Sequence, residues 1–116
     1  MFKELKCRTG NAKIYIAGCP IKARQICQQW VEKGACVNVV DTEYIYKYGC
    51  EKGVVVEFIN YPRFPKGIEA MIKDAEALGR SLAIGLSAGS YSIAFAWGIG
   101  KGSQTTKFYS RRGDIE

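Results

Sequence analysis

The chain has 116 residues, and not one of them is histidine. Histidine is the side chain that most often acts as a general base near neutral pH, and it is also the commonest metal ligand in proteins. Most hydrolase and metalloenzyme mechanisms are therefore disfavoured. The leading expectation is a protein that binds a ligand without catalysing a reaction, with no catalytic residue, no metal and no cofactor.

The sequence also lacks close cysteine pairs and long apolar runs. Its five cysteines form no C-x-x-C motif, which argues against a structural zinc site and indicates free thiols in a reducing, intracellular setting. No apolar run approaches the ~18 residues of a membrane span, and the charged N-terminal segment does not resemble a signal peptide. We therefore expect a soluble protein that has no membrane partner.

Acidic residues are the minority charge. Seventeen Lys and Arg against eleven Asp and Glu give a net charge of +6 and a pI near 9.1. Residues 87–112 contain no acidic side chain at all, so the positive charge is concentrated near the C-terminus. This balance favours anionic partners such as nucleotides, nucleic acid or anionic lipid.

The hydrophobic pattern predicts one domain over residues 1–116, with strands separated by two helices. We expect strands or strand pairs at residues 13–17, 35–48, 54–59, 90–97 and 104–111, a turn at 48–53, and helices at 20–34 and 68–86. The interpretation is an α+β fold, in which a mostly antiparallel sheet carries two helices packed on one face.

Two glycine-rich segments resemble catalytic or phosphate-binding motifs. Residues 85–89 match G-x-S-x-G, but a helix precedes the serine and a strand follows, the reverse of a nucleophile elbow. Residues 98–103 contain Gly-Lys-Gly-Ser without the spacing of a phosphate loop, and a hairpin turn is the favoured interpretation. An anion nest around Lys101 is the weaker alternative.

Three other segments offer side chains for an anionic, aromatic ligand. The stretch 105–112 combines hydroxyls, rings and arginines, and strand alternation places Thr106 and Phe108 on one face and Lys107 and Tyr109 on the other. Arg63 lies between two prolines, in a stiff loop that suits phosphate binding, although a solvated arginine is equally consistent. Tyrosines at alternate positions of 44–48 could stack bases, but cross-strand packing or an oligomer interface is favoured.

Five segments together resemble a known family. They are residues 14–18 (IYIAG), 23–27 (ARQIC), 42–46 (TEYIY), 59–65 (INYPRFP) and 108–112 (FYSRR). In this succession the chain resembles the first-described Thoeris anti-defence family of phage proteins. The resemblance implies a nucleotide sponge that sequesters glycocyclic ADP-ribose, a cyclic ADP-ribose isomer, without cleaving it, and so blocks bacterial immune signalling in the cytoplasm of the infected host. Members of the family assemble as homodimers or hexamers, and some also hold cyclic trinucleotides at separate sites.

The resemblance also implies ligand roles for individual residues. The terminal strand would supply Arg111, Arg112 and Thr106, and the preceding strand would supply Tyr91 and Phe95 as rings that stack on adenine. Arg63 would lie at an anion site suited to the trinucleotide, and its neighbours Asn60 and Tyr61 are further candidate ligand-binding residues.

Two alternatives from other classes stay open. One is a basic domain that binds single-stranded nucleic acid through the tyrosine row, for which affinity would fall steeply with salt. The other is an enzyme that degrades a cyclic nucleotide, which the absence of a visible base or metal set disfavours.

Overall fold

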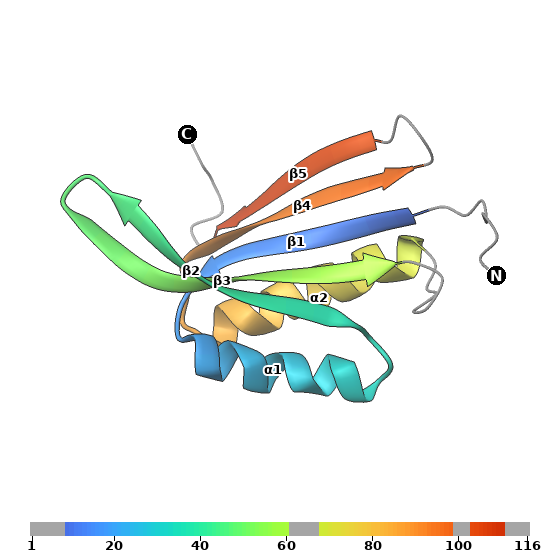
Figure 1. The fold of residues 1–116 in the computed structure, drawn as a ribbon, viewed down its shortest axis with the longest axis horizontal. Helices are drawn as coiled ribbons and strands as arrows, with labels where there is room; N and C mark the ends of the chain where they lie inside the picture. Colours follow the sequence, from blue (N-terminus) through green and yellow to red (C-terminus); the bar gives the residue numbers. More distant parts are fainter. Residues whose placement is uncertain (1–8, 61–67, 99–102, 111–116) are drawn as a thin grey trace, which may run out of the picture.

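The computed structural model describes residues 9–60, 68–98 and 103–110. The elements follow the chain in the order β-α-β-β-α-β-β (Figure 1). Their bounds are β1 Thr9–Ala17, α1 Pro20–Glu32, β2 Val37–Tyr46, β3 Gly49–Asn60, α2 Ile68–Gly85, β4 Ser90–Gly98 and β5 Ser103–Ser110. Residues 35–48, which were expected to form one strand or a bent pair, contain the single strand β2.

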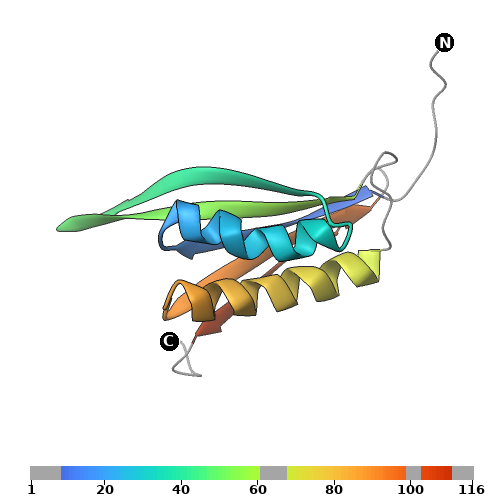
Figure 2. The ribbon, with the colours of Figure 1, turned by 90° about the horizontal axis from the view of Figure 1, so that it is seen from below.

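The strands form one five-stranded sheet in the order β2-β3-β1-β4-β5, and every neighbouring pair is antiparallel. Both helices lie on the same side of this sheet, as Figure 2 shows. The predicted α+β class, with a mostly antiparallel sheet and two helices on one face, is confirmed.

The core lies between the sheet and the helices. Alternate strand residues point into it, as their period of two requires, and α2 contributes side chains at helical spacing. The fully buried large side chains are Ile14, Ile16, Met71, Leu78, Leu82, Ile93, Val54 and Val56. Burying one such side chain is worth roughly 1.5–3 kcal/mol, so this layer holds the helices against the sheet.

Both helices end in the same hydrogen-bonded motif. After α1, Gly34 adopts φ 101°, and Ala35 N–H donates to Trp30 O at 3.0 Å. After α2, Ser87 adopts φ 55°, and Ala88 N–H donates to Ala83 O at 2.9 Å. The residue in the left-handed region is normally glycine. The predicted stop at Gly34 is confirmed, and the G-x-S-x-G match is part of a helix-to-strand turn, as expected.

The β2–β3 hairpin projects beyond the other strands as an arm, residues 43–52 (Figure 1). Pairing of β1 with β3 stops at Ala17 and Gly53, so beyond that point β2 and β3 pair only with each other. The turn predicted at residues 48–53 is wrong, because the chain reverses at Lys47 and Tyr48 and β3 begins at Gly49. Tyr48, with φ 76° and 93% exposure, occupies the tip.

No helix within the described residues has both the length and the apolar character needed to cross a membrane.

Candidate functional site

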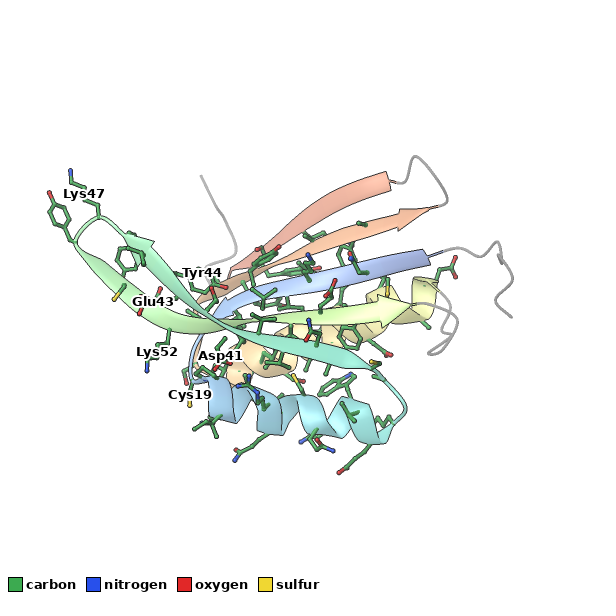
Figure 3. The ribbon with its side chains drawn as sticks, viewed as in Figure 1. Cys19, Asp41, Glu43, Tyr44, Lys47 and Lys52 are labelled. Atoms are coloured by element: carbon green, nitrogen blue, oxygen red, sulfur yellow. The ribbon has the colours of Figure 1, made fainter. Side chains whose placement is uncertain are left out.

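A pocket of about 760 Å³ lies where the arm leaves the sheet, beside the start of α1. Its walls come from the β1–α1 junction, from α1, from β2 and from β3. The lining residues are Gly18, Cys19, Pro20, Ile21, Arg24, Asp41, Thr42, Glu43 and Lys52. Figure 3 shows Cys19, Asp41 and Lys52 close together at this place. We call it the arm-base pocket; its volume is within the range of small-molecule sites.

The β1–α1 junction needs a glycine, and this fixes one wall of the arm-base pocket. Gly18 has φ 151°, and a Cβ atom there would lie 2.9 Å from Leu86. Its N–H donates to Lys52 O at 2.9 Å, which ties the junction to β3. Pro20 then starts α1 at a position where a missing N–H costs no helical hydrogen bond. The start of the helix is thereby held against the base of the arm.

Two basic and two acidic side chains line the arm-base pocket. Arg24 Nη2 on α1 lies 2.6 Å from Asp41 Oδ1 on β2, so one pair is already neutralised. Glu43 and Lys52 face each other across the β2–β3 ladder. Within the described part of the chain, neither of these two makes a salt bridge or any other polar side-chain contact. The pocket therefore presents one free carboxylate and one free ammonium group side by side.

Cys19 adds a thiol to the same pocket. It is exposed at the residue before α1, where the backbone N–H groups of Lys22 and Ile21 and the charges of Lys22 and Lys52 lower its pKa. Burial in the core has the opposite effect on Cys27, whose pKa rises to about 11. Cys50 is exposed as well, whereas Cys36 is only half-buried. Among the described residues, no group of acidic or thiol side chains could hold a metal ion.

A second polar cluster joins β5 to α2. Tyr109 Oη donates to Glu76 Oε2 at 3.2 Å, and Lys107 Nζ lies 3.9 Å from Glu76 Oε1. Burial and the Glu76 carboxylate raise the pKa of Tyr109 to about 12. Because these contacts satisfy the groups mutually, the cluster anchors the edge strand to the helix.

The predicted adenine-stacking rings lie on the helix side of β4. The Tyr91 ring stacks on the Tyr109 ring, with centroids 4.8 Å apart and planes at 13°. Phe95 is 2% exposed and packs in the core, so in this conformation neither ring presents an open face of the kind predicted. Lys107 and Tyr109 share one face of β5, as the alternation predicts.

The other predicted ligand residues cannot be compared in the same way. Thr106 pairs with Ala94 in the β4–β5 ladder, and Asn60 pairs with Gly10 at the end of β3. The structure describes the backbone of these two residues but not their side chains. Tyr61, Arg63, Arg111 and Arg112 lie outside the described residues altogether. Their ligand roles stay predictions.

The tyrosine row of the arm does not form one continuous platform. Tyr44 Oη donates to Val54 O at 3.2 Å, and burial raises the pKa of this hydroxyl. Tyr46 is 55% exposed, and Tyr48 lies in the turn and not in the strand. Tyr44 therefore packs across the strands, while the rings of Tyr46 and Tyr48 are open to solvent.

Sequence reasoning missed the residues of the arm-base pocket as a set. The turn predicted at residues 48–53 contains Lys52, and no motif marks Asp41 and Glu43. Their spacing of two residues on a strand is the signal that places both carboxylates on one face. The position of Lys52 opposite Glu43 follows from the hairpin register, and that register cannot be derived when the turn is placed at the wrong residues.

A scan against protein-family models and a search of curated proteins found no match. Two solved structures have the same fold. A phage SAM lyase in complex with S-methyl-5'-thioadenosine matches with a TM-score of 0.63 and 12% identity over 95% of both chains. A phage SAM lyase in the apo state matches with a TM-score of 0.60 and 16% identity, over 92% of this chain and 96% of that chain.

These comparisons show a shared fold, and one of the two neighbours holds a small nucleoside ligand. They also overturn the expectation that the chain is not an enzyme, since both neighbours of this fold are lyases. Neither comparison identifies the chain with the Thoeris anti-defence family. The fold of this chain is therefore that of the phage SAM lyases.

Proposed function

We propose that this chain is a phage anti-defence protein that binds S-adenosylmethionine (SAM) and cleaves it to S-methyl-5'-thioadenosine. The observation that carries the proposal is the fold shared with a phage SAM lyase over 95% of both chains, in a structure that holds this same thioether. Removing SAM would deprive host methyltransferases of their methyl donor. Such an activity would act in the cytoplasm of the infected bacterium.

The reaction follows from the ligand's chemistry. Methylthioadenosine keeps the methyl group, the sulfur and the adenosine of SAM, so the bond that breaks joins the sulfonium to Cγ of the amino-acid chain. The substrate's own carboxylate oxygen attacks Cγ, a new C–O bond closes a five-membered lactone, and the C–S electron pair returns to sulfur. The products are the neutral thioether and homoserine lactone, and no water or proton is consumed.

This reaction needs no general base, which makes it compatible with a chain that lacks histidine. The sulfonium is already a good leaving group, and the nucleophile is already ionised at neutral pH. The protein's tasks are to fold the substrate so that oxygen, Cγ and sulfur lie in line, and to limit its contact with water. Because the attacking carboxylate and the sulfonium both lose their charge in the reaction, a site with little water favours the transition state.

A second candidate ligand is a cyclic ADP-ribose isomer such as glycocyclic ADP-ribose. Residues 59–65 and 108–112, which resemble the Thoeris anti-defence family, favour it, and the ligand shares its adenosine with SAM. On this proposal Arg111, Arg112 and Thr106 would contact the ligand, and Arg63 with Asn60 and Tyr61 would hold a cyclic trinucleotide. Assembly as a homodimer or hexamer belongs to the same proposal.

The test incubates purified protein with SAM in water enriched in oxygen-18 and analyses the products by mass spectrometry. We expect methylthioadenosine together with homoserine lactone. Any homoserine formed by later opening of the lactone should carry the label in its carboxyl group, because water then attacks the acyl carbon. Label at the γ-hydroxyl would mean hydrolysis of SAM and would refute the ring-closing step.

A parallel incubation with glycocyclic ADP-ribose separates the two candidate ligands. Unchanged SAM, combined with retention of the cyclic nucleotide after filtration, would replace the first proposal with the second. Retention of neither, with salt-sensitive binding of single-stranded nucleic acid, would refute both.

A further inference from the structure

We infer that the arm-base pocket binds the zwitterionic amino-acid end of the ligand, with Lys52 holding the α-carboxylate and Glu43 holding the α-ammonium group. The inference rests on the proposed function for the identity of the ligand. It goes beyond that function by assigning the amino-acid end of the ligand to particular residues of this chain.

The arm-base pocket carries unpaired charge among its described lining residues. Glu43 and Lys52 are direct partners in the β2–β3 ladder, and such partners have Cβ atoms about 4.5–5.5 Å apart. In the described part of the chain they nevertheless form no salt bridge with each other or with a third residue. Two adjacent, unpaired charges of opposite sign match the two charges of an α-amino acid.

The two other charged side chains of the pocket already form a salt bridge with each other. Arg24 and Asp41 pair at 2.6 Å and together add no net charge to the pocket wall. They therefore do not compete for the ligand's ammonium or carboxylate group. Among the described residues that line the pocket, Lys52 is the one cation without a salt bridge, so one carboxylate oxygen can be held while the other stays available to attack Cγ.

The size and walls of the pocket also suit this ligand. Its volume of about 760 Å³ exceeds what an amino-acid group needs and leaves room for a sulfonium and part of a nucleoside. Pro20 and Ile21 form an apolar wall at the start of α1. The charged and apolar walls thus suit a molecule that is ionic at one end and less polar beyond it.

The pocket contains its own reporter, because the exposed Cys19 thiol is part of its lining. Cys50 is an internal control, since it is exposed on the arm and does not line the pocket. The experiment measures the rates at which iodoacetamide alkylates both thiols, by peptide mass spectrometry. S-adenosylhomocysteine, which has the amino-acid end and cannot react as a sulfonium, is compared with methylthioadenosine, which lacks that end.

We expect S-adenosylhomocysteine to slow alkylation of Cys19 but not of Cys50, and methylthioadenosine to leave both rates unchanged. Lys52→Gln and Glu43→Gln should each weaken this protection roughly tenfold to a hundredfold, because each removes a charge-assisted hydrogen bond. Lys47→Gln and Glu51→Gln are the matched controls, since both residues lie on the arm outside the pocket. These two variants should behave like the wild type, and thermal unfolding should confirm that all four remain folded.

The outcomes separate this inference from the proposed function. If the wild type cleaves SAM but S-adenosylhomocysteine never protects Cys19, the lyase proposal stands and the pocket assignment is refuted. If SAM is not cleaved but S-adenosylhomocysteine or methionine protects Cys19 in a Lys52-dependent way, the pocket assignment stands and the lyase proposal fails. Absence of both cleavage and protection would refute both.

Discussion

Replacement of Gly53 by alanine should destabilise the protein by about 2 kcal/mol. Gly53 lies where the arm leaves the sheet, paired with Ala17 of β1 and Thr42 of β2. A Cβ atom at this position would lie 2.5 Å from Ile16 O and would also collide with the ring of Tyr44. The ring could rotate away, but the carbonyl belongs to the β1 backbone, so the strands themselves would have to shift.

The magnitude is the difference between two effects. Overpacking of this kind costs roughly 1–3 kcal/mol, and the upper end applies because a backbone atom is involved. Removing a glycine from the unfolded chain returns roughly 0.4–1 kcal/mol of that cost. For a chain of this length, a net loss of about 2 kcal/mol corresponds to a melting temperature lower by roughly 8 °C.

Urea and thermal unfolding followed by circular dichroism would measure this loss. Gly89→Ala is the matched control, because no atom lies within 4 Å of the Cβ that it would add. The control should stay within about 0.5 kcal/mol of the wild type or be slightly more stable. If Gly53→Ala were equally stable, the close approach of the strands at the arm base would be wrong. If the added substitution Tyr44→Ala restored full stability, the ring and not the backbone would be the source of the cost.

Three further predictions concern single side chains. Ser87→Gly should stabilise the protein by about 0.5–1 kcal/mol in urea unfolding, because it removes the cost of a left-handed residue after α2, and an unchanged or lower stability would contradict the helix-end motif. The Tyr109 hydroxyl should stabilise the fold fully below pH 10, its ordinary pKa, and lose that contribution as the pH rises toward 12, because folding raises its pKa. The stability difference between the wild type and Tyr109→Phe should therefore narrow above pH 10, and a constant difference would show that folding does not raise this pKa. Near neutral pH, Cys19 should react with iodoacetamide much faster than Cys27, since one pKa is lowered and the other is about 11; equal rates in the folded protein would contradict the buried position of Cys27.

Much of the fold could be predicted from local patterns. In α1, Ala23 and Cys27 recur at helical spacing, and both are buried. Ile14 and Ile16 alternate along β1, and both point into the core. These patterns come from the geometry of helices and strands, so a single sequence contains them.

The arm could not be predicted in the same way. The five residues from Gly49 to Gly53 contain two glycines, and glycines usually signal a turn. In the structure the turn residue is Tyr48, and Gly53 is required by the close approach of a neighbouring strand. That requirement is a tertiary contact and leaves no local pattern in the chain.

The candidate site was missed for a related reason. Glu43 and Lys52 become neighbours only through the register of the hairpin. Arg24, which lines the same pocket, comes from α1. The wrong expectation of a protein without enzymatic activity came from the absence of histidine. That argument applies to reactions that need a general base, and it does not apply to a substrate with its own nucleophile and a charged leaving group.

The central claim is best tested by counting turnovers. Purified protein is incubated with a large molar excess of SAM, and methylthioadenosine is quantified by chromatography over time against a sample without protein. We expect methylthioadenosine to accumulate to many equivalents per chain at a rate proportional to protein concentration. Recovery of intact SAM, with no product beyond that of the protein-free sample, would contradict it.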